Sequence, residues 1–330
     1  MKRMMLLLIA LFLLGLVTLQ APSNAAETQL TIGASGTASS QYAYWVAVGQ
    51  AIKKNAPGIM PTVIETGGVL DNIQRLIRKQ VDFCLAQGIT AYEAYHGKAK
   101  WEGTPHQELR WLWLQGTSAM AIFVREDSGI NSIYDLTGKR FCAGARGSGN
   151  EKILEGVLGL LGIKPDYYRG DFSDAAEAVQ NRQIVGFAKW SNTVKSGDAL
   201  VMQIAATTKL KFLSIPKEDL QKIKKEFPYV GVGSYPPNVY KGQNYEVSTF
   251  MAPGGALTST NLSKDLGYRV SQAVWKGKEG IEAAFPGAKE FHMFKDAVNF
   301  FPFPLHVGTI AFCKELGIDV PQHLVPPEYK

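Results

Sequence analysis

The chain has 330 residues, of which 46% are apolar and 19% are charged, and its formal net charge is +6. This balance is typical of a folded globular protein and excludes a highly charged disordered chain. The basic residues are scattered except for a cluster at 222–225 in a short amphipathic stretch, which favours a solvated helix face over a nucleic-acid-binding patch.

The first 26 residues have the order of features found in secretory signal peptides. Lys2 and Arg3 precede an apolar run at 4–19, and small residues at 23–26 offer a cleavage position. The alternative is an uncleaved membrane anchor, but the run is shorter than the roughly 20 residues that a membrane span requires. We therefore expect export to the periplasm and a mature chain of 304 residues with a net charge of +4.

The first half of the mature chain alternates short strands with helices. Apolar runs predict strands at 30–33, 62–66 and 81–86, and apolar residues at helical spacing predict helices at 42–54 and 72–79. The order strand–helix–strand–helix–strand predicts a parallel sheet with right-handed crossovers.

A second unit of the same kind follows, and then a tail of mixed character. The predicted strands are 110–115, 121–124, 140–144, 167–168, 184–189, 246–251 and 256–258, and the predicted helices are 153–161, 175–181, 266–276 and 306–316. Two similar halves followed by a mixed tail predict an α/β protein with two lobes. We expect residues 27–120 with 252–330 to form one lobe and residues 121–251 to form the other.

The cysteines and histidines do not form a metal-binding pattern. Cys84 and Cys142 lie in strand-like apolar runs, which predicts buried thiols, and Cys313 is distant from both. The odd number leaves one disulfide open in an oxidising compartment and at least one cysteine outside it. The five histidines are dispersed, so we expect no metal site and no cofactor.

The first loop of interest joins a predicted strand to a predicted helix at 33–42. Its glycines allow close backbone approach, the start of the helix presents unpaired N–H groups, and Ser35 and Thr37 add hydroxyls. These features favour an anion such as a carboxylate, although an ordinary helix cap explains them equally well.

Two further loops lie at the carboxyl ends of predicted strands, where parallel α/β sheets bind ligands. One contains Gly68 and Asn72, and the amide of Asn72 could either cap a helix or face a ligand. The other, at 144–150, repeats the features of the first loop in the second half of the chain. Its Arg146 adds a planar donor suited to a carboxylate. Two such loops facing each other across a cleft would hold a small acid from both sides.

Motifs of nucleotide-binding proteins and of common hydrolases are absent from the sequence. There is no G-x-x-x-x-G-K-[ST], no G-x-G-x-x-G spacing in the first loop and no G-x-S-x-G. His292 and His306 have no evident carboxylate partner, and His306 directly precedes a predicted helix, which favours a capping role. We therefore expect no catalytic residues and no enzymatic activity.

The ordered series of motifs resembles the TAXI family, the solute-binding subunits of tripartite ATP-independent periplasmic (TRAP) transporters. The motifs cover nearly the whole mature chain, and no single one is decisive. They are T-I-G-x-S-G-T at 31–37, Tyr42, G-x-x-x-N at 68–72, V-D-F-x-L-A-Q at 81–87, D-L-x-G-K-R at 135–140, G-S-G-N-E at 147–151, P-P-x-x-Y-x-G at 236–242 and P-L-H-x-G at 304–308.

The resemblance implies a two-lobed periplasmic-binding-protein fold of type II, with hinged lobes that close on a ligand in the cleft between them. It implies capture of a small organic acid or amino acid, of the glutamate-like or dicarboxylate class, and delivery to the membrane subunits of a TRAP transporter. The ligand-binding residues that it implies are Ser35, Thr37, Tyr42, Asn72, Gln87, Gly147, Ser148 and Gly149.

The chain departs from the family pattern at three places, the first of which is the first loop, where Ala34, Ala38, Ser39 and Ser40 replace some of the usual glycines. Gly68 stands where serine is common, and Lys189, Trp190 and Asn192 lie where the family often has small residues and a Gly-x-Pro. We include the four residues at the second and third of these places in the expected site, with Arg146 or Lys189 as the charged partner of a ligand carboxylate. A lysine and a tryptophan at the cleft would change the shape and charge of the ligand.

The sequence leaves two alternative functions open. The chain could serve an ABC importer or a sensor kinase in place of a TRAP transporter, which the neighbouring genes would distinguish. It could also be an exported enzyme on a similar scaffold, which requires a nucleophile or an acid–base pair that the sequence does not offer.

Overall fold

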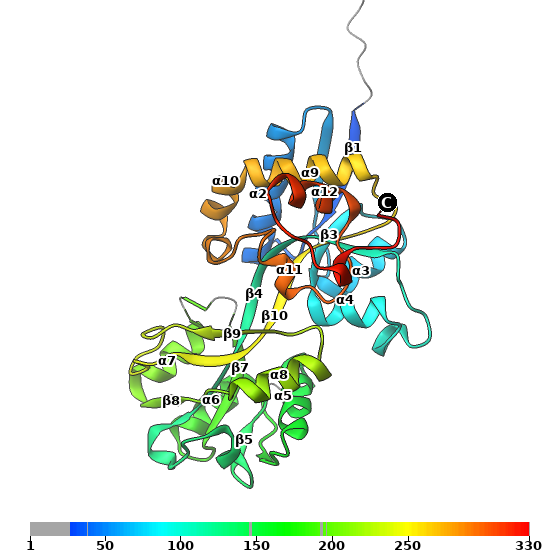
Figure 1. Ribbon diagram of the computed structural model, residues 1–330. Coiled ribbons are helices and arrows are strands. Elements are labelled where there is room, and N and C mark those ends of the chain that lie inside the picture. The colour runs from blue at the N-terminus through cyan, green and yellow to red at the C-terminus, as the bar shows by residue number, and fades with distance from the viewer. Residues whose placement is uncertain (1–26, 38, 145–146, 192–193, 196, 330) are drawn as a thin grey trace, which may run out of the picture.

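The computed structural model describes residues 27–37, 39–144, 147–191, 194–195 and 197–329. They form two lobes joined by two long strands (Figure 1). Within these ranges, no helix combines the length and the apolar character that crossing a membrane requires. The signal peptide expected at 1–26 lies outside the described residues.

The first lobe, at the top of Figure 1, is built on a strand–helix–strand–helix–strand unit. Its elements are β1 (Thr28–Gly33), α2 (Ser40–Asn55), β2 (Ile59–Ile64), α3 (Val69–Ile77) and β3 (Phe83–Gln87). Strand β1 pairs in parallel with both β2 and β3, which confirms the predicted parallel arrangement.

The second lobe repeats this unit with shorter strands. Its elements are β5 (Arg140–Cys142), α5 (Gly149–Leu160), β6 (Asp166–Tyr167), α6 (Phe172–Gln180) and β7 (Gly186–Ser191). Strand β5 pairs in parallel with β6 and β7, so the second parallel unit is also confirmed.

Two long antiparallel strands, β4 (Leu109–Arg125) and β10 (Val247–Ser259), run from one lobe into the other (Figure 1). They join the two parallel units into one sheet of ten strands, ordered β2-β1-β3-β10-β4-β7-β5-β6, with β8 on β4 and β9 on β10. Each was predicted as two separate strands. That prediction is wrong because the glycines that interrupt the apolar runs lie inside the strands, where the register shifts next to Gly254 and Gly255.

Further helices, two short strands of the same sheet and several 3₁₀ turns complete the two lobes. The other helices and strands are α4 (Gly88–Tyr95), α7 (Ala199–Thr207), β8 (Leu210–Phe212), α8 (Lys217–Glu226), β9 (Gly231–Tyr235), α9 (Lys264–Lys276), α10 (Lys278–Ala284), α11 (Ala297–Phe300) and α12 (Val307–Glu315). The 3₁₀ turns are η1 (Ala99–Trp101), η2 (Glu126–Ser128), η3 (Ile133–Leu136), η4 (Pro286–Glu290) and η5 (Gln322–Leu324).

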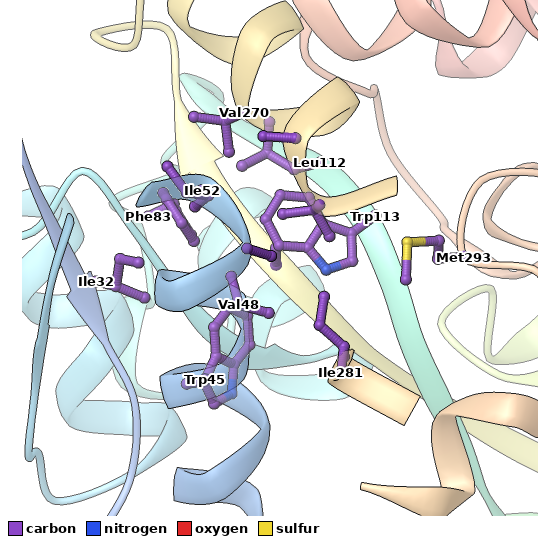
Figure 2. Packing of buried hydrophobic residues seen from close by; sticks show 14 of the residues in the cluster. Ile32, Trp45, Val48, Ile52, Phe83, Leu112, Trp113, Val270, Ile281 and Met293 are labelled. Carbon is purple, nitrogen blue, oxygen red and sulfur yellow. The ribbon is translucent and has the colours of Figure 1, made fainter. Parts of the chain in front are cut away.

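The core of the first lobe is rich in aromatic rings. Trp45 from α2 packs near Phe83 of β3 and Trp113 of β4, and the rings of Phe83 and Trp113 meet edge to face with centroids 5.5 Å apart (Figure 2). Burial of such rings contributes more to stability than burial of smaller side chains, because each removes a large apolar area from water. This packing holds the first half of the crossing strand β4 within the first lobe.

Two predictions about single side chains are confirmed. Cys84 and Cys142 are buried, and together with Cys313 they are free thiols. Burial raises the pKa of all three thiols, to about 12 for Cys313. His306 is the N-cap of α12, where Nδ1 accepts a hydrogen bond from the N–H of Gly308 at 3.2 Å.

Candidate ligand-binding site

A cleft of about 280 Å³ lies where the crossing strands pass between the lobes. Its walls come from α2, β3, α4, the middle of β4 and β10, and the segment around η4; in the described residues, the second lobe contributes Trp190 of β7. The lining residues are Gln41, Leu85, Gln87, Ile89, Gln115, Gly116, Thr117, Ser118, Trp190, Ala252, Gly254, Phe285 and Gly287. A recess of this size between two lobes suits a small molecule.

The described lining is polar but uncharged. Gln115 is only 5% exposed and its Nε2 donates a hydrogen bond to Oε1 of Gln41. Thr117 is also buried, and its hydroxyl contacts the sulfur of Met251 at 3.9 Å. Apolar contact surface comes from the half-buried rings of Trp190 and Phe285. The cleft therefore offers amide and hydroxyl groups beside two aromatic rings.

The first predicted loop is engaged with a carboxylate of the chain itself. Both the N–H and the hydroxyl of Thr37 donate to Oε1 of Glu65, at 3.0 and 3.4 Å. Ser35 is 8% exposed, and its hydroxyl has no partner in the described residues. Tyr42, in the first turn of α2, is half-buried and packs against the core of the first lobe. None of these three residues lines the cleft.

The second predicted loop is also closed by an internal carboxylate. The N–H of Gly67 donates to Oδ2 of Asp71 at 3.0 Å, and Asp71 also accepts from Arg75 at 2.8 Å. The hydrogen bond from Arg75 and then that from Gly67 hold the pKa of Asp71 below its usual value. Gly68 precedes α3 with a φ of 94°, a conformation that glycine adopts easily.

Asn72 joins two strands and does not reach the cleft. It is fully buried, and its Nδ2 donates to the carbonyl oxygens of Ala34, after β1, and Leu85, in β3, at 2.7 and 2.9 Å. Its donors bind backbone and it is not among the lining residues, so its role as a ligand-binding residue stays a prediction. Asn150 has the same role in the second lobe, where it binds the carbonyls of Ala143 and Ala188.

The third predicted loop follows the same pattern. The N–H of Gly147 donates to Oε2 of Glu151 at 2.7 Å, and Ser148 caps α5 by accepting from the N–H of Glu151 at 3.2 Å. Gly149 is the first residue of α5 and has open space around it. None of these residues lines the cleft, and Arg146 lies outside the described residues.

The two predicted residues on β7 differ in position. Lys189 forms an ion pair with Asp198, which also caps α7 by accepting from the N–H groups of Leu200 and Val201. Trp190 lines the cleft, and its backbone N–H donates to Oδ1 of Asn150 at 3.0 Å. Asn192 lies outside the described residues. Among the predicted residues that the structure describes, Gln87 and Trp190 are the two that meet in the cleft.

Sequence reasoning missed Gln41, Gln115 and Phe285. Gln41 lies at the end of the first loop and carries the same kind of signal as Ser35 or Thr37. Gln115 ends an apolar run inside β4, at a position that the register between β4 and β10 passes over, and it lines the cleft. Phe285 belongs to a turn whose position depends on the whole first lobe, so no local pattern marks it.

The lobes also touch directly beside the cleft. Glu290 of η4, in the first lobe, accepts hydrogen bonds from the N–H groups of Val194 and Lys195 in the second lobe, at 3.0 and 3.3 Å. Elsewhere, Lys152 of α5 lies 3.5 Å from Glu93 of α4. These contacts connect the two lobes in the conformation that the structure shows.

The described residues contain no group of three or more histidine, cysteine, aspartate or glutamate side chains that could hold a metal ion. His306 donates from Nε2 to the carbonyl of Leu262 at 2.9 Å while Nδ1 accepts from Gly308, and burial lowers its pKa. His292 accepts from the N–H of Lys295 at 3.1 Å. Both histidines therefore have structural partners in the fold.

The fold is that of type II periplasmic solute-binding proteins, as predicted. The putative periplasmic sulfonate-binding protein SsuA of Methylobacillus flagellatus superposes with a TM-score of 0.53 at 13% identity, covering 92% of this chain and 93% of that one. A TctC solute-binding protein from Polaromonas gives a TM-score of 0.53 at 16% identity, covering 81% and 88%. A sequence model described as the NMT1-like family matches residues 32–317, which is most of the chain. The chain therefore belongs to the NMT1-like family.

Proposed function

We propose that this chain is an extracytoplasmic solute-binding protein that captures a small organic molecule between its lobes and delivers it to a membrane transporter. The observation that carries the proposal is the cleft itself. It lies on the two strands that connect the lobes, and it combines hydrogen-bonding side chains from the first lobe with Trp190 from the second. A ligand that contacts both lobes binds their closed arrangement best and shifts the population toward it.

The proposed ligand is a small organic acid or amino acid whose carboxylate is held mainly by neutral donors. Lys189 forms an ion pair with Asp198, and the loop N–H groups of Thr37 and Gly147 donate hydrogen bonds to carboxylates of the chain itself. Amide and hydroxyl donors in the cleft can solvate a carboxylate without a cation, provided that enough of them converge on it. Arg146 remains the predicted cationic partner.

We propose a TRAP-type secondary transporter as the partner, on the basis of the sequence motifs. In this proposal residues 1–26 direct export to the periplasm, residues 27–120 with 252–330 form the first lobe, and residues 121–251 form the second. An ABC importer is the second candidate, because one of the similar structures is a sulfonate-binding protein of an ABC transporter. A neighbouring gene for a fused, many-helix permease would support the first candidate, and a neighbouring ATPase gene would support the second.

The test is a search for bound solute in the purified mature protein. Mass spectrometry of co-purified small molecules and a thermal-shift screen of organic acids, amino acids and sulfonates should identify a solute that raises the melting temperature. Replacement of Trp190 by alanine should reduce that shift, whereas replacement of the exposed Met202 should preserve it. If no solute of any of these classes binds, the proposed function is wrong.

A further inference from the structure

The cleft contains a pair of hydrogen-bonded glutamines from two different elements. Gln41 comes from the first turn of α2, and Gln115 comes from the crossing strand β4. Gln115 is almost completely buried and donates from Nε2 to Oε1 of Gln41, while both side chains line the cleft. The mutual hydrogen bond holds the two amides next to each other in the wall of the cleft.

The hydrogen-bonding capacity of this pair can be counted. Each glutamine amide has two N–H donors and one carbonyl acceptor. The mutual bond uses one N–H group of Gln115 and the oxygen of Gln41. The two N–H groups of Gln41, the second N–H group of Gln115 and the Oε1 acceptor of Gln115 remain. If both amides rotate by 180°, the donor and acceptor of the mutual bond exchange and the pair again offers both kinds of group. The pair therefore carries free donors and a free acceptor in either arrangement.

The surroundings of the pair are uncharged. In the part of the lining that the structure describes, the polar side chains are glutamine, threonine and serine, and the rest are apolar residues and glycines. A carboxylate placed against the pair can accept from its N–H groups, but it leaves the free carbonyl oxygen of the pair facing another acceptor, with no cationic side chain among these residues to offset the repulsion. A carboxamide carries one donor and one acceptor and would satisfy both groups.

We infer that the Gln41–Gln115 pair selects a solute that carries an uncharged carboxamide-type group, in which an N–H donor and a carbonyl oxygen lie side by side. This inference rests on the proposed function and deepens it, since the group is a second polar end of the captured acid. A site built to bond an N–H group discriminates strongly against an analogue that lacks it, because its own buried acceptor is then left unpaired.

Matched ligand pairs test this inference. Succinamate and succinate, glutaramate and glutarate, and phthalamate and phthalate each share one carboxylate and differ only in whether the second group is a carboxamide or a carboxylate. Isothermal titration of all six against the mature protein at one pH and salt concentration gives three affinity ratios. In the pair that binds most tightly, we expect the carboxamide member to bind at least tenfold more tightly.

Three variants connect that ratio to the two glutamines. Gln41→Met and Gln115→Met keep the side-chain length and remove the amide, and each should bring the ratio close to one. Gln50→Met changes an exposed glutamine on the same helix as Gln41 and should leave the ratio unchanged. Circular dichroism shows whether each variant folds, and Gln41→Met decides the matter if the buried Gln115→Met does not fold.

Several outcomes would overturn the inference. It is overturned if the dicarboxylates bind as tightly as their carboxamide partners. It is also overturned if the affinity ratio is unchanged in a folded Gln41→Met or Gln115→Met variant. Failure of all six compounds would also overturn it, while the proposed function would stand if another solute binds in the wider screen. If the wider screen finds no ligand either, the proposed function fails and the inference fails with it.

Discussion

Glu290 should control how easily the two lobes separate. Among the described residues, its carboxylate accepts backbone N–H groups of the other lobe from Val194 at 3.0 Å and Lys195 at 3.3 Å. The same short segment also contributes Gly287 to the cleft, so the contact lies at the rim of the proposed binding site. Replacement of Glu290 by alanine removes both hydrogen bonds without altering the backbone groups of the second lobe.

The expected effect follows from the chemistry of these two bonds. A buried hydrogen bond to a charged group contributes about 1.5–3 kcal/mol. The bond from Val194 is partly buried and the bond from Lys195 is exposed, so each is taken as about 1 kcal/mol after discounting for solvent. A total of about 2 kcal/mol corresponds to a roughly thirtyfold shift of the equilibrium from closed toward open lobes. The ligand-free protein should therefore open more often in the variant.

Amide hydrogen exchange measures this effect without knowledge of the ligand. The N–H groups of Val194 and Lys195 should be protected in the wild type and exchange roughly thirtyfold faster in Glu290→Ala, and small-angle scattering should show a larger radius of gyration. Glu279→Ala, which removes a carboxylate from α10 in the same lobe, should change neither quantity. Unchanged exchange at both N–H groups in a folded Glu290→Ala would refute the assignment of Glu290 as a contact that holds the lobes together.

Three further predictions concern single residues. Trp190→Ala should weaken binding of the identified solute at least tenfold by calorimetry, because it removes the described aromatic surface that the second lobe contributes to the cleft; equal affinity would exclude that role. Burial lowers the pKa of His306, so the folded chain binds fewer protons than the unfolded chain, and stability should fall as the pH drops below about 6.5. His306→Asn, which can still cap α12, should flatten this part of a denaturation profile, and an unaltered profile would contradict the assignment. Gly255→Ala would place a methyl group 2.2 Å from the carbonyl oxygen of Trp113, so we expect the free energy of unfolding, measured with urea, to fall by about 2 kcal/mol. An unchanged free energy of unfolding would show that the two strands move apart to accept the methyl group.

The local pattern of the sequence was sufficient for the two parallel units. Apolar runs separated by helical periodicity predicted β1, α2, β2, α3 and β3 in the right order, because these elements follow from short-range periodicity. The crossing strands could not be predicted in the same way. Their glycines resemble strand ends in isolation, and only the pairing between β4 and β10 shows that they are bulged positions inside long strands.

The candidate site was predicted less completely than the fold. Gln87 and Trp190 follow the rule that ligands lie beyond the carboxyl ends of parallel strands, and both line the cleft. The same rule also selected loop residues whose donors the chain itself uses. The N–H group of Thr37 is taken by the carboxylate of Glu65, and that of Gly147 is taken by the carboxylate of Glu151. Residue type and spacing alone do not show that these carboxylates lie close enough to accept the bonds.

The continuity of β4 and β10 has a consequence for attempts to dissect the protein. The division proposed between residues 120 and 121 and between 251 and 252 falls within both strands, each of which contributes buried residues at its two ends. A fragment that ended at residue 120 would lack β10, which lies between β3 and β4, and would expose the unpaired edges of both strands, a condition that promotes aggregation. We therefore expect residues 27–120 expressed alone to form inclusion bodies.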